Sequence, residues 1–186
     1  MELIKVIFFA IGTFFGVDNS IVMAEKTNVS IDTKTQTITI NQNNLFTIIR
    51  NEQDSIKVAE QLYRISNQAT EEERYQWREE FNDYKLKTLD ITTNKEKKQL
   101  DISIKLKYNT SKDLKVFAID YVEAENSYAI INIESWNIDT DKGELKGNYW
   151  YFKDDISFSM SPAATMPEQY KPLKKDLYTF WKMIKP

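Results

Sequence analysis

Cysteine and histidine are both absent from the 186 residues of this chain. Their absence excludes disulfide bonds and thiol nucleophiles, together with the haem, iron–sulfur and typical zinc sites that depend on these side chains. It also removes the usual general base near neutral pH, so an enzyme built on this chain would have to use carboxylates, tyrosine, lysine or serine. No catalytic or cofactor motif stands out, and we expect neither a cofactor nor a bound metal.

An excess of positive charge is also missing, since 25 lysine and arginine residues face 28 acidic residues and the net charge is −3. This balance argues against a nucleic-acid-binding protein, which normally carries a basic surplus or stripe. Glycine and proline are scarce, at four each, while 41% of the residues are hydrophobic. The composition therefore predicts one globular domain with ample material for a core.

Residues 1–24 have the pattern of a secretory signal peptide. Lys5 precedes an apolar run over 6–17, and polar residues at 18–20 break the run. Residues 22–24 offer small or medium-sized side chains at the positions that a signal peptidase reads. The run is shorter than the roughly 20 residues that span a membrane. An uncleaved anchor that contacts the membrane and a buried N-terminal helix are the alternatives.

The remaining residues, 25–186, are predicted to form a single α+β domain. A domain of this size that is exported without any cysteine fits a bacterial envelope better than a eukaryotic extracellular space. We therefore expect a periplasmic, envelope-associated or secreted location. Asn28–Ile40 reads as a β-hairpin, with a turn at Asp32–Lys34. Asn51 or Asp54 caps a helix that runs to about Ser66.

A second helix is predicted from Thr70, which forms a capping box with Glu73, to about Leu86. Its aromatic side chains recur at helical spacing at Trp77, Phe81 and Tyr84. Such a stripe can line a ligand site, but we expect it to pack on a sheet. A final amphipathic helix is predicted from about Pro172, either to close the core with its lysines in water or to meet a membrane or partner.

The segment Leu100–Met160 predicts an antiparallel β-meander of four to five strands, covered by helices. Apolar and polar residues alternate from Leu100 to Tyr108, which is typical of a strand with one buried face. Residues 114–123 and 128–138 are apolar on both faces, as central strands usually are. Tight turns then suggest that Tyr108 pairs with Asp113, Ala124 with Tyr128, and Ile138 with Leu145.

This register places polar and aromatic side chains together on the outer face of the meander. The candidate ligand-binding residues are Asp120, Asn132, Glu134, Trp136, Tyr149 and Tyr151. Aromatic and amide side chains on a concave sheet suit a sugar, a peptide or a small amphipathic ligand. Asp120 and Glu134 would be diagonal neighbours, and two close carboxylates can act as an acid/base pair. The alternative is a face that is solvated or covered by the N-terminal hairpin.

Asp139–Glu144 has some of the spacing of a calcium-binding loop, but Gly143 occupies a ligand position, so we interpret the segment as a turn. Helices followed by a curved meander that ends in Tyr149–Phe152 resemble the cystatin-like and nuclear-transport-factor-2-like folds over residues 55–160. That resemblance implies either an enzyme or a binding module. We expect a non-enzymatic exported module that binds a small ligand or a protein partner. A carboxylate-dependent hydrolase or isomerase is the alternative.

Overall fold

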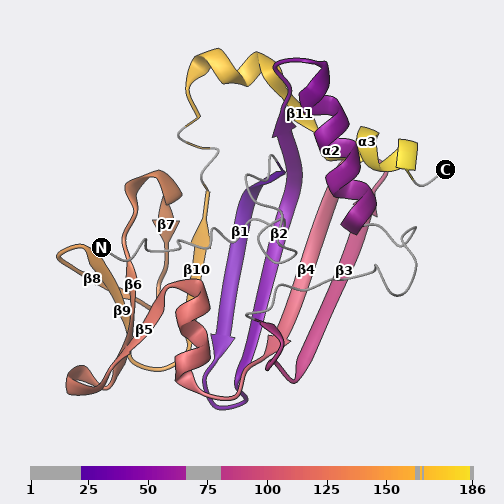
Figure 1. Ribbon diagram of the computed structural model, residues 1–186. Coiled ribbons are helices and arrows are strands. Elements are labelled where there is room, and N and C mark those ends of the chain that lie inside the picture. Colours follow the sequence, from indigo (N-terminus) through magenta and orange to yellow (C-terminus); the bar gives the residue numbers. More distant parts are fainter. Residues whose placement is uncertain (1–21, 66–80, 162–163, 165, 185–186) are drawn as a thin grey trace.

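The computed structural model describes residues 22–65, 81–161, 164 and 166–184. The predicted signal peptide or anchor, up to residue 21, and most of the second predicted helix lie outside these residues. Within them, strands form two antiparallel sheets, one of seven strands and one of four (Figure 1). The predicted α+β class, a mostly antiparallel sheet protein with a few helices, is confirmed.

The large sheet has the strand order β3-β4-β2-β1-β10-β7, and β11 pairs with the second half of β2. Its strands, in chain order, are β1 (Met23–Asp32), β2 (Thr37–Ile48), β3 (Leu86–Asn94), β4 (Gln99–Lys107), β7 (Ile138–Asp139), β10 (Ile156–Met160) and β11 (Lys174–Asp176). The N-terminal hairpin is therefore part of the main sheet, and its two strands lie at the centre. Figure 1 shows β1 and β2 between β10 on one side and β4 on the other.

The predicted hairpin at 28–40 is confirmed and is longer than expected, since β2 continues through the polar residues 41–44. Its inward side chains alternate and are buried, among them Ile31, Ile38 and Ile40. In the turn, the Asp32 carboxylate accepts the backbone N–H groups of Lys34 and Thr35 at 2.9 and 2.8 Å. These hydrogen bonds, that of Thr35 first, lower the pKa of Asp32.

Two α-helices pack against each other, α2 (Glu52–Ile65) and α3 (Leu177–Ile184). Asn51 caps α2, because its Oδ1 accepts the backbone N–H of Asp54 at 3.1 Å. The last helix starts later than predicted: Pro172 lies in the 3-10 helix η6 (Glu168–Leu173), and β11 intervenes. Leu177 and Trp181 of α3 are buried with the sheet core, as expected for a helix that closes the core.

No helix in the described part of the chain is long and apolar enough to cross a membrane.

The small sheet has the order β5-β6-β9-β8 and lies beside the β10–β7 edge of the large sheet in Figure 1. Its strands are β5 (Ile119–Val122), β6 (Ser127–Ile131), β8 (Glu144–Lys146) and β9 (Tyr149–Phe152). Short 3-10 helices connect these elements: η2 (Ser111–Phe117), η3 (Glu123–Glu125) and η4 (Glu134–Trp136).

The prediction of a single meander is therefore wrong. β4 pairs with β2 and β3, and Tyr108 does not pair with Asp113. The segment after β4 folds as η2, in which Thr110 and Asp113 form a capping box. Leu114 and Phe117 are buried three residues apart, which is helical spacing. The apolar character on both sides that suggested a central strand arises from this short helix.

The aromatic stripe of the second predicted helix is described only at Phe81 and Tyr84. Both are buried and pack on Phe117, with ring centroids 5.8 and 6.5 Å away. The Tyr84 hydroxyl donates to the backbone carbonyl of Asp113 at 2.7 Å, and burial raises its pKa. These residues belong to the core, as expected, but β3 begins at Leu86, so the predicted helix does not extend that far.

Candidate functional site

The register of the small sheet decides which predicted site residues meet. Asp120 lies opposite Ala129, Ala129 opposite Tyr151, and Tyr151 opposite Glu144, so one row crosses all four strands. Residues that are directly opposite share a face of the sheet. Asp120, Tyr149 and Tyr151 therefore share one face, as predicted.

The register of β6 differs from the prediction on both sides. Val122, rather than Ala124, starts the pairing of β5 with β6, opposite Ser127. On the other side Ile131 lies opposite Tyr149. The prediction placed Ala124 opposite Tyr128, where the structure has Tyr121, and it placed Phe152 opposite Ile131, where the structure has Tyr149. Each pairing is thus displaced by three residues, and an odd displacement moves every side chain of a strand to the opposite face. Side chains of β6 that were predicted to share a face with Asp120 and Tyr151 therefore lie on the opposite face of the small sheet.

Asn132 follows β6 and is separated from the two tyrosines by this change of face. Its Oδ1 accepts a hydrogen bond from Nε1 of Trp150 at 3.1 Å. Glu134 and Trp136 lie past the end of β6, in η4. Trp136 is only 3% exposed and belongs to the core. The structure thus brings together three of the six predicted residues, Asp120, Tyr149 and Tyr151.

The predicted acidic pair is not formed. Asp120 lies opposite Ala129 and is 3.8 Å from Nζ of Lys115, with both side chains exposed. Glu134 lies beyond the strand that carries Ala129, so it is not a cross-strand neighbour of Asp120.

A cavity of about 410 Å³ opens on the face that carries Tyr151. Its walls come from η3, β6, β8, β9, the turn after β7 and the turn between β9 and β10. The lining residues are Glu125, Ser127, Asp141, Lys142, Gly143, Glu144, Lys146, Tyr151, Lys153, Asp154 and Asp155. The volume falls in the range of small-molecule sites. Of the six predicted residues, only Tyr151 lines this cavity.

Ser127 is the buried polar group of this cavity. It is 2% exposed, and its hydroxyl oxygen has no hydrogen-bond partner in the described structure. A buried hydroxyl without a partner costs roughly 1–3 kcal/mol. A ligand group that bonds to Ser127 recovers that free energy.

Charged side chains of both signs surround Ser127, with more carboxylates than ammonium groups. Nζ of Lys146 lies 3.2 Å from Oε2 of Glu144 and 5.7 Å from the centroid of the Tyr151 ring. The hydrogen bond to Glu144 and the charge of that carboxylate raise the pKa of Lys146, and Glu125 adds to the effect. The cavity thus already holds one cation between a carboxylate and an aromatic face.

Two turns that form the cavity walls are fixed by hydrogen bonds to the large sheet. Asp155 Oδ1 accepts the backbone N–H of Thr33 at 3.1 Å and its hydroxyl at 3.3 Å. Thr140 donates its hydroxyl to the carbonyl of Ser157 at 2.6 Å and accepts the backbone N–H of Lys142 at 3.0 Å. Residues 140–143 thus form a turn, which is how we interpreted this segment from the sequence. Within the described ranges, no group of three or more acidic residues is placed to hold a metal ion.

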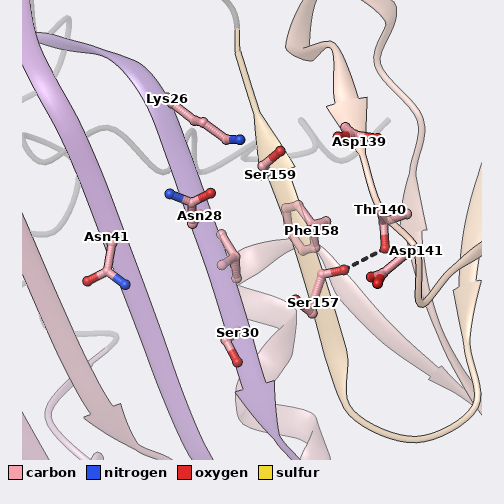
Figure 2. A pocket seen from close by; sticks show the side chains of 11 residues that line it. Lys26, Asn28, Ser30, Asn41, Asp139, Thr140, Asp141, Ser157, Phe158 and Ser159 are labelled. Carbon is pink, nitrogen blue, oxygen red and sulfur yellow. Dashed lines mark hydrogen bonds between the residues drawn. The ribbon is translucent and has the colours of Figure 1, made fainter.

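A second cavity, of about 340 Å³, lies on the polar face of the large sheet (Figure 2). Figure 2 shows Asn28 and Ser30 of β1 beside Ser157 and Ser159 of β10. Its amides already have partners: Asn28 Nδ2 donates to Asn43 Oδ1 at 3.0 Å, and Asn41 Oδ1 accepts the Ser103 hydroxyl at 2.7 Å. None of the side chains that line this second cavity is a buried polar group without a partner, in contrast to Ser127.

Most residues of the Ser127 cavity were missed in the sequence because charged turn residues look like any solvated turn. The one available signal was that two charged turns, 141–144 and 153–155, flank Tyr151. The chain matches no known protein family, and neither a curated protein nor a solved structure shows significant similarity to it.

Proposed function

We propose that this protein is a binding module that takes a small polar ligand into the cavity at Ser127. The observation that carries the proposal is a buried hydroxyl without a partner, in a cavity of about 410 Å³ beside an aromatic ring. Pockets that place a few polar groups next to an aromatic wall are typical ligand sites. The cystatin-like or nuclear-transport-factor-2-like layout stays a prediction within this proposal.

Both carboxylates and lysines line the cavity, so it offers both hydrogen-bond acceptors and donors. A ligand rich in hydroxyl groups uses both kinds, since each hydroxyl donates one hydrogen bond and accepts others. The face of Tyr151 packs against the apolar side of such a ligand. A hydroxyl-bearing small molecule is the ligand class that these groups support best.

Binding is favoured over catalysis by the register. The hydrolase or isomerase alternative required Asp120 and Glu134 as neighbours, and the small sheet does not place them together. Export to the bacterial periplasm, envelope or medium is part of the proposal and is supported by the pattern of residues 1–24. Its direct test is the intact mass of the protein in cell fractions of the native host.

The binding site is tested by titrating the isotope-labelled protein with a panel of sugars, polyols and small polar compounds while amide chemical shifts are recorded. We expect shifts at 125–127, 141–146 and 151–155 for a binding compound. Ser127→Ala removes the buried hydroxyl and should weaken binding about tenfold, as expected for about 1.4 kcal/mol. Ser159→Ala, on the other polar cavity, is the matched control. Shifts that cluster elsewhere, or equal binding by both variants, would refute the site.

A further inference from the structure

We infer that the ligand of the Ser127 cavity carries a cationic amino group next to its hydroxyls, as an amino sugar does. This inference rests on the proposed function, because it names the ligand class of the same site. Three observations on the cavity carry it: its unbalanced charge, the position of Lys146, and the buried hydroxyl of Ser127.

The charge of the cavity favours a cation. Five carboxylates and three lysines line it, so the site has a net negative charge. Glu144 is paired with Lys146, and Asp155 accepts hydrogen bonds from Thr33. Glu125, Asp141 and Asp154 make no side-chain hydrogen bond or ion pair with another described residue. These three carboxylates are available to an ammonium group and would repel an acidic ligand.

Lys146 shows where a ligand ammonium would lie. Its Nζ is held between the carboxylate of Glu144 and the ring of Tyr151, which is the arrangement that recognises ammonium groups. The side chain is 49% exposed on the outermost strand of the small sheet, so it can leave toward solvent. A ligand cation can take its place and keep both contacts.

Ser127 argues against a simple alkylammonium ion as the ligand. The hydroxyl is almost fully buried and has no partner in the described residues, so an apolar ligand would leave it unsatisfied. A ligand with hydroxyls satisfies Ser127, and its amino group meets the carboxylates. The site is thus complementary to a molecule that has both groups on one small ring.

The test compares glucosamine, glucose and glucuronate, which share a ring and differ in charge. Titrations of the full chain follow the amide shifts of 125–127, 141–146 and 151–155, at a pH where the amine is protonated. We expect glucosamine to bind roughly tenfold more tightly than glucose, because charge-assisted hydrogen bonds replace neutral ones, and glucuronate to bind most weakly. Added salt should reduce the advantage of glucosamine.

Substitutions test which side chains cause the preference for glucosamine over glucose. Glu144→Gln should reduce the preference for glucosamine over glucose, whereas Lys146→Met, which removes the competing ammonium, should increase it. Asp90→Asn, an exposed acid on β3, is the control and should change neither.

The outcomes separate the two proposals. Equal affinity for glucosamine and glucose at the cavity would overturn the amino-group inference and leave the proposed binding function intact. If none of the three sugars shifts the cavity amides, the inference also fails. The binding function fails only if the wider panel of polar compounds leaves those amides unchanged as well.

Discussion

Gly143 is required by the packing of a single ring. A Cβ atom at this position would lie 2.8 Å from Cε1 of Phe152, a side chain that is 1% exposed and cannot move away. Gly147 differs, since its φ is +59° and nothing lies within 4 Å of its added Cβ. The first glycine provides space, and the second provides a left-handed backbone.

We expect Gly143→Ala to lower the free energy of unfolding by about 1–3 kcal/mol, the usual cost of overpacking. Gly143→Asn should cost at least as much. At Gly147, asparagine should cost less than alanine, because asparagine tolerates the left-handed region. Denaturant unfolding of the four variants checks this pattern, and a Gly143→Ala protein as stable as the parent would contradict it.

We expect the buried Tyr108 to make the stability of the fold depend on pH above 10. Its ring is buried, its hydroxyl has no partner among the described residues, and burial raises its pKa to about 12 from an ordinary 10.0. The folded state therefore prefers the neutral phenol, and this contribution to stability is full below pH 10 and is lost as pH rises from 10 toward 12. Tyr108→Phe should raise stability at pH 7 by up to about 1–3 kcal/mol, because it removes a buried hydroxyl that has no partner among the described residues.

The same substitution should make stability fall less steeply above pH 10, as measured by urea unfolding at several pH values. Tyr63→Phe is the control, since that side chain is 47% exposed. Identical alkaline profiles for Tyr108→Phe and the parent would show that Tyr108 does not titrate in this way.

At the scale of the element, β1 begins before the predicted cleavage point. Met23 and Ala24 pair with Phe46 and Leu45, and the side chains of Val22 and Ala24 are buried. Burial of a valine side chain contributes about 1.5–3 kcal/mol. A chain that starts at Glu25 should therefore be less stable than one that starts at Val22 by about 1–3 kcal/mol.

Thermal and denaturant unfolding of the two chains measure this difference. A third chain that starts at Val22 and carries Val22→Ser and Ala24→Ser tests whether burial, rather than length, is the cause. It should resemble the shorter chain. Equal stability of all three would mean that a cut after Ala24 removes nothing that the fold needs.

The elements also show which sequence patterns predicted structure well. The alternation of apolar and polar residues correctly predicted β4 and β10. Each strand buries the side chains of one face and leaves those of the other face partly or fully exposed. It failed at Leu114–Phe117, where buried residues at helical spacing also looked like a two-faced strand. The capping box of Thr110 and Asp113 was the signal that could have distinguished them.

Register was harder to predict than the existence of strands. The β5–β6 connection has four residues, 123–126, and ends with Asn126 in the left-handed region at φ 47°. The predicted connection was one residue shorter. Since side chains alternate, that difference was enough to move the side chains of β6 to the opposite face relative to β5. The cavity itself depends on turns that meet only in three dimensions, so the two charged turns that flank Tyr151 in the sequence do not by themselves predict it.

At the scale of the whole molecule, Asp155 connects the turn at the cavity to the β1–β2 turn of the large sheet through two hydrogen bonds to Thr33. Thr33→Ala removes the hydroxyl bond and keeps the backbone one. We expect a coupling free energy of about 0.5–1.5 kcal/mol in a double-mutant cycle of Thr33→Ala and Asp155→Ala.

Unfolding in denaturant measures that cycle. Thr37→Ala, whose hydroxyl bonds only within its own turn, supplies the control cycle with Asp155→Ala and should show no coupling. Additive effects of Thr33→Ala and Asp155→Ala would show that the two turns are energetically independent.

The strand order of the large sheet has a consequence for biosynthesis. β1 and β2 are made first, yet their partners β10 and β11 belong to the last part of the described chain. A growing chain therefore cannot complete the centre of its own sheet until residues 174–176 have left the ribosome. Non-local pairing of this kind folds slowly. The free edge of β1 stays unpaired until β10 has been made, although β4 can cover β2 earlier, so we expect the growing chain to expose an open strand edge that favours aggregation.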